Sequence, residues 1–232
     1  MAKKQLKIIS VGGSIIIPKT GFDISFLKKF RRLLIKEIKK GQRFILVVGG
    51  GTTCRMYQGA AAKISRLSSE DLDWIGIQST VFNAHFMRFM FKDYAYSKIV
   101  QNPSEKISSA KPIVVAAGWK PGASTDMDTV LLAKTYGAKE LINLSNVSYV
   151  YDKDPRKHAG AKKIEQIDWK TFRKDIVGMG ASWKPGSNLP FDPVASKEAE
   201  SLGLKVLMLD GTDLKEVEKA LQGDQFKGTL IW

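Results

Sequence analysis

Apolar residues follow two patterns that alternate along the chain. Short segments rich in apolar residues, which are typical of strands, occupy residues 6–11, 44–48, 112–117, 140–144, 204–209 and 228–232, and the run over 44–48 is continuous. Segments in which apolar residues recur every three or four positions, as on one side of a helix, cover residues 23–40, 52–66, 70–91, 193–202 and 212–222. A further helix opens at Ser124 or Thr125, a short one lies near 168–177, and residues 94–111 give no clear pattern. Strands alternating with helices predict an α/β fold, with a mainly parallel central sheet covered by helices on both faces.

Glycine-bearing loops follow four of the predicted strands. They contain Gly12-Gly13, Gly49 to Gly51, Gly118 to Gly122, and the stretch after Asn146. Ligands of such sheets bind at the carboxyl ends of the strands. This clustering is the strongest indication, from the residues themselves, of a site that handles phosphate.

The loop from Gly118 to Asp126 joins a predicted buried strand to the start of a helix. Free amide groups and the positive end of the helix dipole favour an anion at such a point. Asp126 adds a carboxylate, which suits a metal-bound phosphate or a ribose hydroxyl. The alternative is that Ser124, Thr125 and Asp126 only cap a structural helix.

Composition narrows the class of protein. A chain of 232 residues can bury a substantial core in one domain, and its net charge of +14 favours anionic partners such as nucleotides, phosphates or nucleic acid. Much of the charge lies in the helix over 23–40, where the aromatic residues fall on the core side, a pattern that disfavours nucleic acid. The single cysteine, Cys54, excludes an internal disulfide and a multi-cysteine zinc site.

Several functional classes lack their sequence signatures in this chain. There is no P-loop motif, no Gly-x-Gly-x-x-Gly after a strand, and no protein-kinase signature set. His85 and His158 are the only histidines, which disfavours histidine-based acid–base chemistry. No apolar run approaches the roughly 20 residues that span a bilayer, and the start of the chain lacks a secretory signal, so we expect a cytoplasmic protein.

A series of short motifs runs through the chain in a characteristic order. The motifs are Gly12-Gly13-Ser14; Val47-Val48-Gly49-Gly50-Gly51 with Arg55 and Tyr57; Asp73-Trp74-Ile75-Gly76-Ile77 with Asn83; Pro121-Gly122-Ala123-Ser124-Thr125-Asp126; Asn146-Val147 with Val150-Tyr151-Asp152-Lys153-Asp154-Pro155; and Phe191-Asp192-Pro193-Val194-Ala195. Each motif alone is weak, but all of them in this order make a specific signal. Together they resemble the amino acid kinase superfamily, and within it the archaeal-type uridylate (UMP) kinases.

The resemblance implies a fold, an assembly and a reaction. The fold is a three-layer α/β/α sandwich in a single domain over residues 1–232, with a UMP half at about 1–135 and an ATP half at about 136–232. The family assembles as dimers and, in UMP kinases, as hexamers, so a homo-oligomer is expected. The implied reaction is ATP + UMP → ADP + UDP with Mg²⁺, which is carried by ATP rather than by a dedicated metal site.

The resemblance also assigns roles to individual residues. The ATP-binding residues would be Gly12, Gly13, Gly51, Arg55, Ser145, Asn146, Tyr151 and Asp154. The UMP-binding residues would be Gly50, Asp73, Trp119, Lys120, Pro121, Gly122, Ala123, Ser124 and Thr125. The catalytic residues would be Arg55, suited to bidentate phosphate contact, with Asp126 and Asp192, which would organise Mg²⁺ and the cationic groups. Such a set fits phosphoryl transfer, which depends on positioning and charge stabilisation.

One departure from the family pattern concerns a lysine. Many members carry a lysine two residues before the first glycine of the opening loop, where this chain has Ser10. Lys7 lies three residues earlier in the strand and therefore points to the opposite face. Arg55, Lys120 or Lys184 could supply the charge; Lys184 stands in a second copy of the Trp-Lys-Pro-Gly sequence that contains Lys120.

A second departure lies on the ATP side. The family usually shows Asn-Val-Asp-Gly-Val-Tyr, whereas this chain has Ser148-Tyr149 in place of Asp-Gly. Tyrosine disfavours a positive φ angle, so a reshaped turn is expected. Because both departures fall on the ATP half, two alternatives stay open: another small-molecule kinase of the superfamily, or a nucleotide sensor or storage protein with weakened catalysis.

Overall fold

The computed structural model describes residues 5–155, 157–179 and 189–232. The strands are β1 (Leu6–Val11), β2 (Arg43–Val48), β3 (Ala95–Val100), β4 (Ile113–Ala116), β5 (Glu140–Ser145), β6 (Val150–Tyr151), β7 (Lys163–Ile164), β8 (Gln166–Ile167), β9 (Lys205–Asp210) and β10 (Thr229–Ile231). The helices are α1 (Gly13–Ile16), α2 (Ile24–Lys39), α3 (Gly51–Ile64), α4 (Ser69–Met90), α5 (Thr125–Tyr136), α6 (Trp169–Thr171), the π-helical segment η1 (Phe172–Val177), α7 (Pro193–Ser201) and α8 (Leu214–Gln222).

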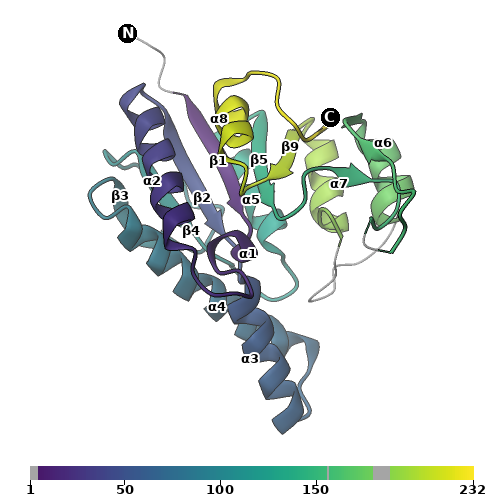
Figure 1. Cartoon of the computed structure of the whole chain (residues 1–232). Coiled ribbons are helices and arrows are strands. Elements are labelled where there is room, and N and C mark those ends of the chain that lie inside the picture. Colours follow the sequence, from purple (N-terminus) through teal and green to yellow (C-terminus); the bar gives the residue numbers. More distant parts are fainter. Residues whose placement is uncertain (1–4, 156, 180–188) are drawn as a thin grey trace.

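Eight strands form the central sheet, in the order β3-β4-β2-β1-β5-β9-β10-β8 (Figure 1). Neighbouring strands are parallel except for the antiparallel pair of β9 and β10. Strands β6 and β7 pair separately as a short antiparallel ribbon. The prediction of a mainly parallel sheet is therefore confirmed.

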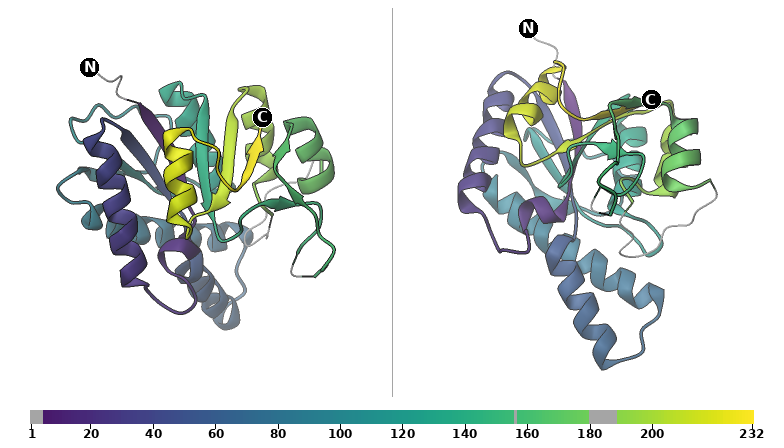
Figure 2. Two further views of the ribbon diagram at one scale, coloured as in Figure 1. Left: turned by 45° about the horizontal axis from the view of Figure 1, so that its top comes forward. Right: turned by 45° about the vertical axis from the view of Figure 1, so that its right-hand side comes forward.

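Helices cover both faces of the sheet. In β1, Ile9 and Val11 face a core made with α2, α4 and α8, whereas Ile8 faces a second core made with α5, α6, η1 and α7. The two views of Figure 2 show these layers on either side of the strands. This is the predicted three-layer α/β/α arrangement, and it follows from strands that are apolar on both faces.

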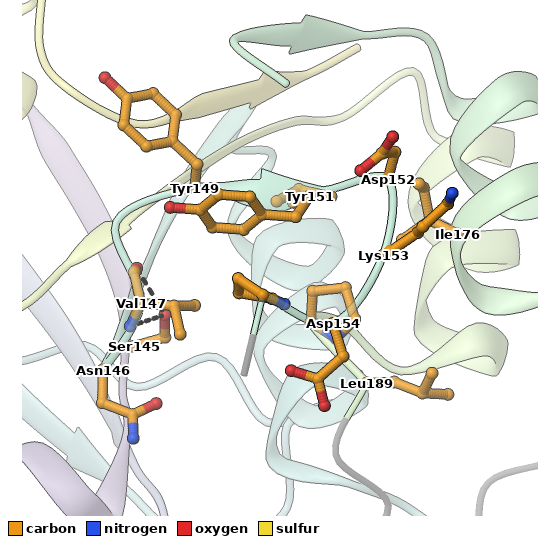
Figure 3. Close-up of a pocket in the computed structure, with 13 residues that line it drawn as sticks. Ser145, Asn146, Val147, Tyr149, Tyr151, Asp152, Lys153, Asp154, Ile176 and Leu189 are labelled. Atoms are coloured by element: carbon orange, nitrogen blue, oxygen red, sulfur yellow. Dashed lines mark hydrogen bonds between the residues drawn. The ribbon is translucent and has the colours of Figure 1, made fainter. Parts of the chain in front are cut away.

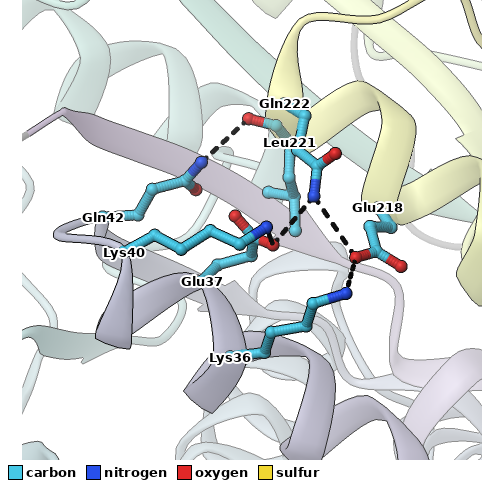
Figure 4. A network of polar contacts seen from close by, with 7 residues as sticks. All are labelled: Lys36, Glu37, Lys40, Gln42, Glu218, Leu221 and Gln222. Carbon is cyan, nitrogen blue, oxygen red and sulfur yellow. Dashed lines mark hydrogen bonds and ion pairs between the residues drawn. The ribbon is translucent and has the colours of Figure 1, made fainter.

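The basic helix α2 is held against α8 by polar contacts (Figure 4). The fully buried carboxylate of Glu37 accepts hydrogen bonds from Lys40 at 2.7 Å and from Gln222 at 3.0 Å. Beside it, Lys36 pairs with Glu218. Part of the positive charge of α2 therefore serves packing within the fold.

The predicted glycine loops meet at one edge of the sheet. Strands β4, β2, β1 and β5 are adjacent and parallel, so their carboxyl ends, and the loops after them, lie side by side. At this same edge, the hairpin of α3 and the first part of α4 projects from the body of the molecule (Figures 1 and 2). Within the described residues, no helix is both long enough and apolar enough to cross a membrane.

Candidate active site

The glycine loops after β1 and β2 contact each other through their backbones. The Gly49 amide donates a hydrogen bond to the Val11 carbonyl at 3.0 Å. A Cβ atom on Gly13 would lie 2.2 Å from the Gly51 nitrogen and 2.5 Å from the Gly49 oxygen, which leaves no room for a side chain. Gly51 also has φ of +59°, a conformation that favours glycine. The glycines thus allow the two loops to close at the centre of the sheet edge.

Gly12 serves the fold in a different way. Its amide donates to the Leu144 carbonyl at 2.9 Å, and a Cβ atom would lie 2.9 Å from that same oxygen. The Gly12 amide is therefore bonded within the protein, although it was expected to bind the phosphates of ATP. Of the two glycines in this loop that were predicted to bind the ATP phosphates, Gly13 is therefore the remaining candidate.

A cavity of about 180 Å³ lies between the start of α3 and α4. It brings together seven residues that were predicted to bind the substrates: Gly50, Gly51, Arg55, Asp73, Ala123, Ser124 and Thr125. It is also lined by residues to which no role was assigned: Cys54, Gln58, Gly76, Ile77, Thr80 and Gly118. We call this space the acceptor cavity.

A signal for part of the missed lining was present in the sequence. Asp73, Ile77 and Thr80 are spaced by four and three positions, so they lie along one side of a helix. Cys54 lies in the wall of the cavity beside Gly50, and burial raises the pKa of its thiol, which disfavours the reactive thiolate.

The loop after β4 is tied down through its amides. Thr80 Oγ1 accepts a hydrogen bond from the Gly118 amide at 2.8 Å, and Asp128 accepts one from the Trp119 amide at 3.2 Å. Asp73 accepts one from the Gly122 amide at 2.8 Å. These three amides are bonded within the protein and are not available to an anion. In this part of the chain, the start of α5 is therefore the better candidate for binding an anion through backbone amides. Of the predicted residues here, Trp119, Lys120, Pro121 and Gly122 lie in the loop but do not line the acceptor cavity.

The cationic candidates have different surroundings. Arg55 is exposed at the acceptor cavity and contacts Thr52 Oγ1 at 3.4 Å. The exposed Lys120 places its ammonium 4.2 Å from the centre of the Trp119 ring. Lys7 is buried and paired with Glu140 at 3.1 Å, and it lies on the face of β1 opposite to Ser10, so it does not replace the family lysine. Lys184 lies outside the described residues.

Asp126 and Asp192 form a carboxylate pair near the carboxyl ends of the central strands. Asp126 accepts hydrogen bonds from Asn143 Nδ2 and from the Asp192 amide, both at 3.1 Å. Burial, and secondly the charge of Asp192, raise the pKa of Asp126 to about 7. Asp192 caps α7 through the amides of Val194 and Ala195, while its buried Oδ2 has no partner among the described residues. Two neighbouring carboxylates, one of which has an unpaired oxygen, are suited to interact with a positively charged group.

Asp128 is a third carboxylate near this pair, and it is buried in α5 two residues after Asp126. Its side chain holds the Trp119 amide through Oδ2, whereas its buried Oδ1 has no hydrogen-bond partner among the described residues. Burial raises the pKa of Asp128 to about 7. No functional role was predicted for this residue from the sequence.

A larger cavity, of about 350 Å³, follows the carboxyl end of β5 (Figure 3). It is lined by the four predicted adenosine-side residues Ser145, Asn146, Tyr151 and Asp154. The ring of Tyr151 lies across the cavity (Figure 3). Tyr149 also lines the cavity, and the Lys163 ammonium lies 4.9 Å from the centre of its ring. No described residue other than glycine has a positive φ angle, so Tyr149 reaches this position in an ordinary conformation, as expected for a reshaped turn. We call this space the ATP-side cavity.

Comparison with known proteins places the chain in a family. Residues 5–210 match the model of the amino acid kinase family. The uridylate kinases of Methanocorpusculum labreanum and Methanococcus aeolicus are each 35% identical to this chain over 226 residues, which cover 97% of the chain and 94% and 98% of those proteins. The crystal structure of uridylate kinase from Archaeoglobus fulgidus superposes with a TM-score of 0.80 at 27% identity, covering 98% of this chain and all of that one. The chain therefore belongs to the amino acid kinase family.

Proposed function

We propose that this chain is a UMP kinase, which transfers a phosphoryl group from ATP to UMP and releases ADP and UDP. The observation that carries the proposal is the acceptor cavity, because it gathers Arg55, Asp73 and the start of α5 from segments far apart in the sequence. The archaeal uridylate kinases match the chain over nearly its whole length. Another small-molecule kinase or a nucleotide sensor is not favoured by these comparisons.

We assign one substrate to each of the two cavities. UMP would occupy the acceptor cavity, with its ribose at Asp73 and its phosphate near Arg55 and the start of α5. ATP would place its adenosine part in the ATP-side cavity, so that its phosphates extend along the sheet edge toward Gly13 and Gly51. The half of the chain before about residue 135 would thus bind mainly UMP, and the half after it mainly ATP.

Catalysis in this arrangement is positioning and charge stabilisation. The exposed guanidinium of Arg55 can contact two phosphate oxygens at once and offset the charge that develops during transfer. Lys120 supplies a second mobile cation in place of the lysine that is absent at Ser10. Asp126 and Asp192 keep cationic groups oriented beside the transferring phosphate.

Mg²⁺ is expected to enter with ATP. Among the described residues, no group of three or more His, Cys, Asp or Glu side chains could hold a metal ion by itself. The unpaired Oδ2 of Asp192 beside Asp126 nevertheless fits a cation that is held mainly by ATP phosphates. When bound, Mg²⁺ would neutralise part of the phosphate charge. We expect the protein to act in the cytoplasm.

The direct test is an ADP-release assay with ATP and Mg²⁺, comparing UMP, CMP, carbamate and acetylglutamate as acceptors. We expect turnover with UMP and loss of that turnover when Mg²⁺ is omitted. Turnover with carbamate or acetylglutamate, but not with UMP, would assign the chain to a different kinase of the family. UMP-dependent stabilisation without turnover would instead indicate a binding protein.

Self-association is the second part of the proposal, and the exposed side of α4 supports it. Trp74, Phe82 and Phe89 are 45%, 70% and 61% exposed, and their spacing places them along one side of the helix. Ile64 is 84% exposed at the end of α3, a helix without a buried residue. A row of exposed aromatic side chains along one side of a helix is typical of a protein interface.

Two copies of the chain would cover this surface by packing their α4 helices together. We expect light scattering after size-exclusion chromatography to give a mass of at least two chains. The double variant Phe82→Asp/Phe89→Asp should elute as a monomer, while Trp232→Asp, at an exposed position outside α4, should not change the mass. A monomeric parent chain would contradict this part of the proposal.

A further inference from the structure

Asn83 connects the inward side of α4 to the glycine loop after β2. The residue is fully buried, and its Nδ2 donates hydrogen bonds to two successive carbonyls, those of Gly49 at 2.9 Å and Gly50 at 3.0 Å. These bonds join residues more than 30 positions apart in the sequence. An amide group is suited to this position because it is a neutral side chain that provides two hydrogens from one nitrogen.

The two bonds determine which way the following amides point. In a trans peptide unit, the carbonyl of one residue and the N–H of the next point in opposite directions. When Asn83 holds the carbonyls of Gly49 and Gly50, the N–H groups of Gly50 and Gly51 are therefore turned away from α4. Neither of these amides donates a hydrogen bond to another described residue.

The amides oriented in this way lie at the place where phosphate is handled. Gly50 and Gly51 line the acceptor cavity together with Arg55, and Gly51 lies against Gly13 of the opening loop. Glycine at both positions gives the peptide planes room to rotate. The Gly50 carbonyl also accepts a hydrogen bond from the Cys54 amide of α3 at 3.2 Å, whereas Asn83 is the one donor to the Gly49 carbonyl among the described residues. Asn83 therefore adds to the hold of α3 at Gly50 and is the anchor at Gly49.

We propose that Asn83 is the positioning residue of the acceptor site, and that it acts by orienting the Gly50 and Gly51 amides toward phosphate oxygens. The inference rests on the proposed function, since the phosphates concerned are those of UMP and ATP. Asn83 itself does not contact substrate. It acts on the reaction only through the loop that it holds.

The experiment compares Asn83→Leu and Asn83→Asp with the matched control Ser79→Ala. Leucine has a similar size but no donor, whereas aspartate has the same shape and presents oxygens to the two carbonyls. Ser79 is a buried polar residue of the same helix whose hydroxyl bonds only to Ile75 of α4, so its loss removes no contact with the loops. Steady-state kcat and KM for both substrates are measured together with thermal stability.

We expect kcat at saturating substrates to fall about 10- to 100-fold in Asn83→Leu, as is typical when oriented backbone donors are lost, and further in Asn83→Asp. The Ser79→Ala control should keep kcat within about twofold, because the hydroxyl that it removes bonds to its own helix and not to the loops of the site. Stability loss alone lowers the amount of folded enzyme, but it does not lower the turnover of each folded molecule, so kcat is corrected for the folded fraction.

An Asn83→Leu enzyme that is folded and retains the parent kcat would overturn the positioning role. Failure of the proposed function would look different, because the parent chain itself would then not turn over UMP. In that case, the dissociation constants of UMP and ATP are compared between the parent chain and Asn83→Leu by calorimetry. Unchanged affinities for both nucleotides would overturn the positioning role there as well.

Discussion

The acceptor cavity and the ATP-side cavity are built in different ways. Around the acceptor cavity, the loops are held by side chains from distant helices, through bonds such as Asp73 to Gly122 and Asn83 to Gly50, which span 49 and 33 residues. Around the ATP-side cavity, Ser145 bonds to Val147, two residues away, and Asp152 to the Lys162 amide, ten residues away. Long-range bonds also reach this side, from the Val150 amide to Thr229 Oγ1 and from the Gly211 amide to the Ser145 carbonyl, both at 2.9 Å.

This difference has a functional consequence. Groups held by packed helices keep their geometry before a ligand arrives, which favours discrimination between acceptors. A loop held mainly by its own local bonds can adjust to its ligand at little cost. We therefore expect UMP recognition to be sensitive to single substitutions, whereas ATP binding tolerates them better.

The largest expected effect is that of Arg55→Met. Removing the guanidinium while keeping a similar length should lower kcat/KM for UMP by about 100- to 1000-fold, because a charged group that stabilises the transferring phosphate is lost. Lys63→Met on the same helix, which lines no described cavity, is the control and should stay close to the parent value. A reduction of less than about fivefold for Arg55→Met would transfer the role to Lys120.

The fold could be predicted well where local pattern and packing agree. The segments Leu6–Val11, Arg43–Val48 and Glu140–Ser145 are rich in apolar residues, and each is a strand that is buried on both faces of the sheet. Strand β3 was missed, because its central residues Ser97 and Lys98 are exposed and its pairing with β4 is irregular. Helix α1 was missed because Ile15 and Ile16 favour strands, and only tertiary contacts keep these residues helical.

The candidate site was predicted less completely than the fold. Glycine loops at strand ends and the residues of the family motifs could be identified, and the structure places seven of the predicted site residues in one cavity. The residues that hold the loops could not be found in this way, because the partners of Thr80, Asn83 and Asp128 are backbone groups of other loops. A residue that bonds to backbone groups leaves no recognisable pairing in a single sequence.

The next largest effect concerns stability and tests the rigidity of the acceptor side. The pKa of Asp128 is raised to about 7 in the folded protein, compared with an ordinary value of about 3.9 for aspartate. A raised pKa means that the folded state holds the proton more tightly. The contribution of this group to stability is therefore fully present below about pH 4 and is lost as pH rises to about 7.

Asp128→Asn should remove this loss of stability at high pH, while it keeps an oxygen that can accept a hydrogen bond from the Trp119 amide. We expect the variant to be about 1–3 kcal/mol more stable than the parent chain at pH 8, with the difference shrinking toward pH 4. Urea unfolding at several pH values measures this, and Asp93→Asn in an exposed turn serves as the control. A variant less stable than the parent at pH 8 would show that the charge of Asp128 is stabilised by a partner, such as Lys120.

Asp73→Asn tests how much UMP binding depends on a single side chain of the acceptor cavity. Asparagine keeps an oxygen for the Gly122 amide but has no charge for a ribose hydroxyl, so KM for UMP should rise about 10-fold, while KM for ATP changes less than about twofold. Glu70→Gln, one turn earlier in the exposed start of α4, is the matched control. Equal changes in both KM values would indicate that Asp73 shapes the whole sheet edge rather than the UMP site.

The smallest effect is expected on the ATP side, for Tyr151→Leu. Its ring lies across the ATP-side cavity (Figure 3), where stacking against a base contributes about 1–3 kcal/mol in comparable sites. Because the surrounding loop is held mainly by local bonds, it can settle around the smaller side chain and recover part of this energy. We therefore expect KM for ATP to rise by only about three- to tenfold with KM for UMP unchanged. Tyr96→Leu on edge strand β3 controls for the loss of a half-buried tyrosine elsewhere. A rise of 100-fold or more would mean that the ATP side is as rigidly built as the acceptor side, and that the local bonds of Ser145 and Asp152 are enough to fix it.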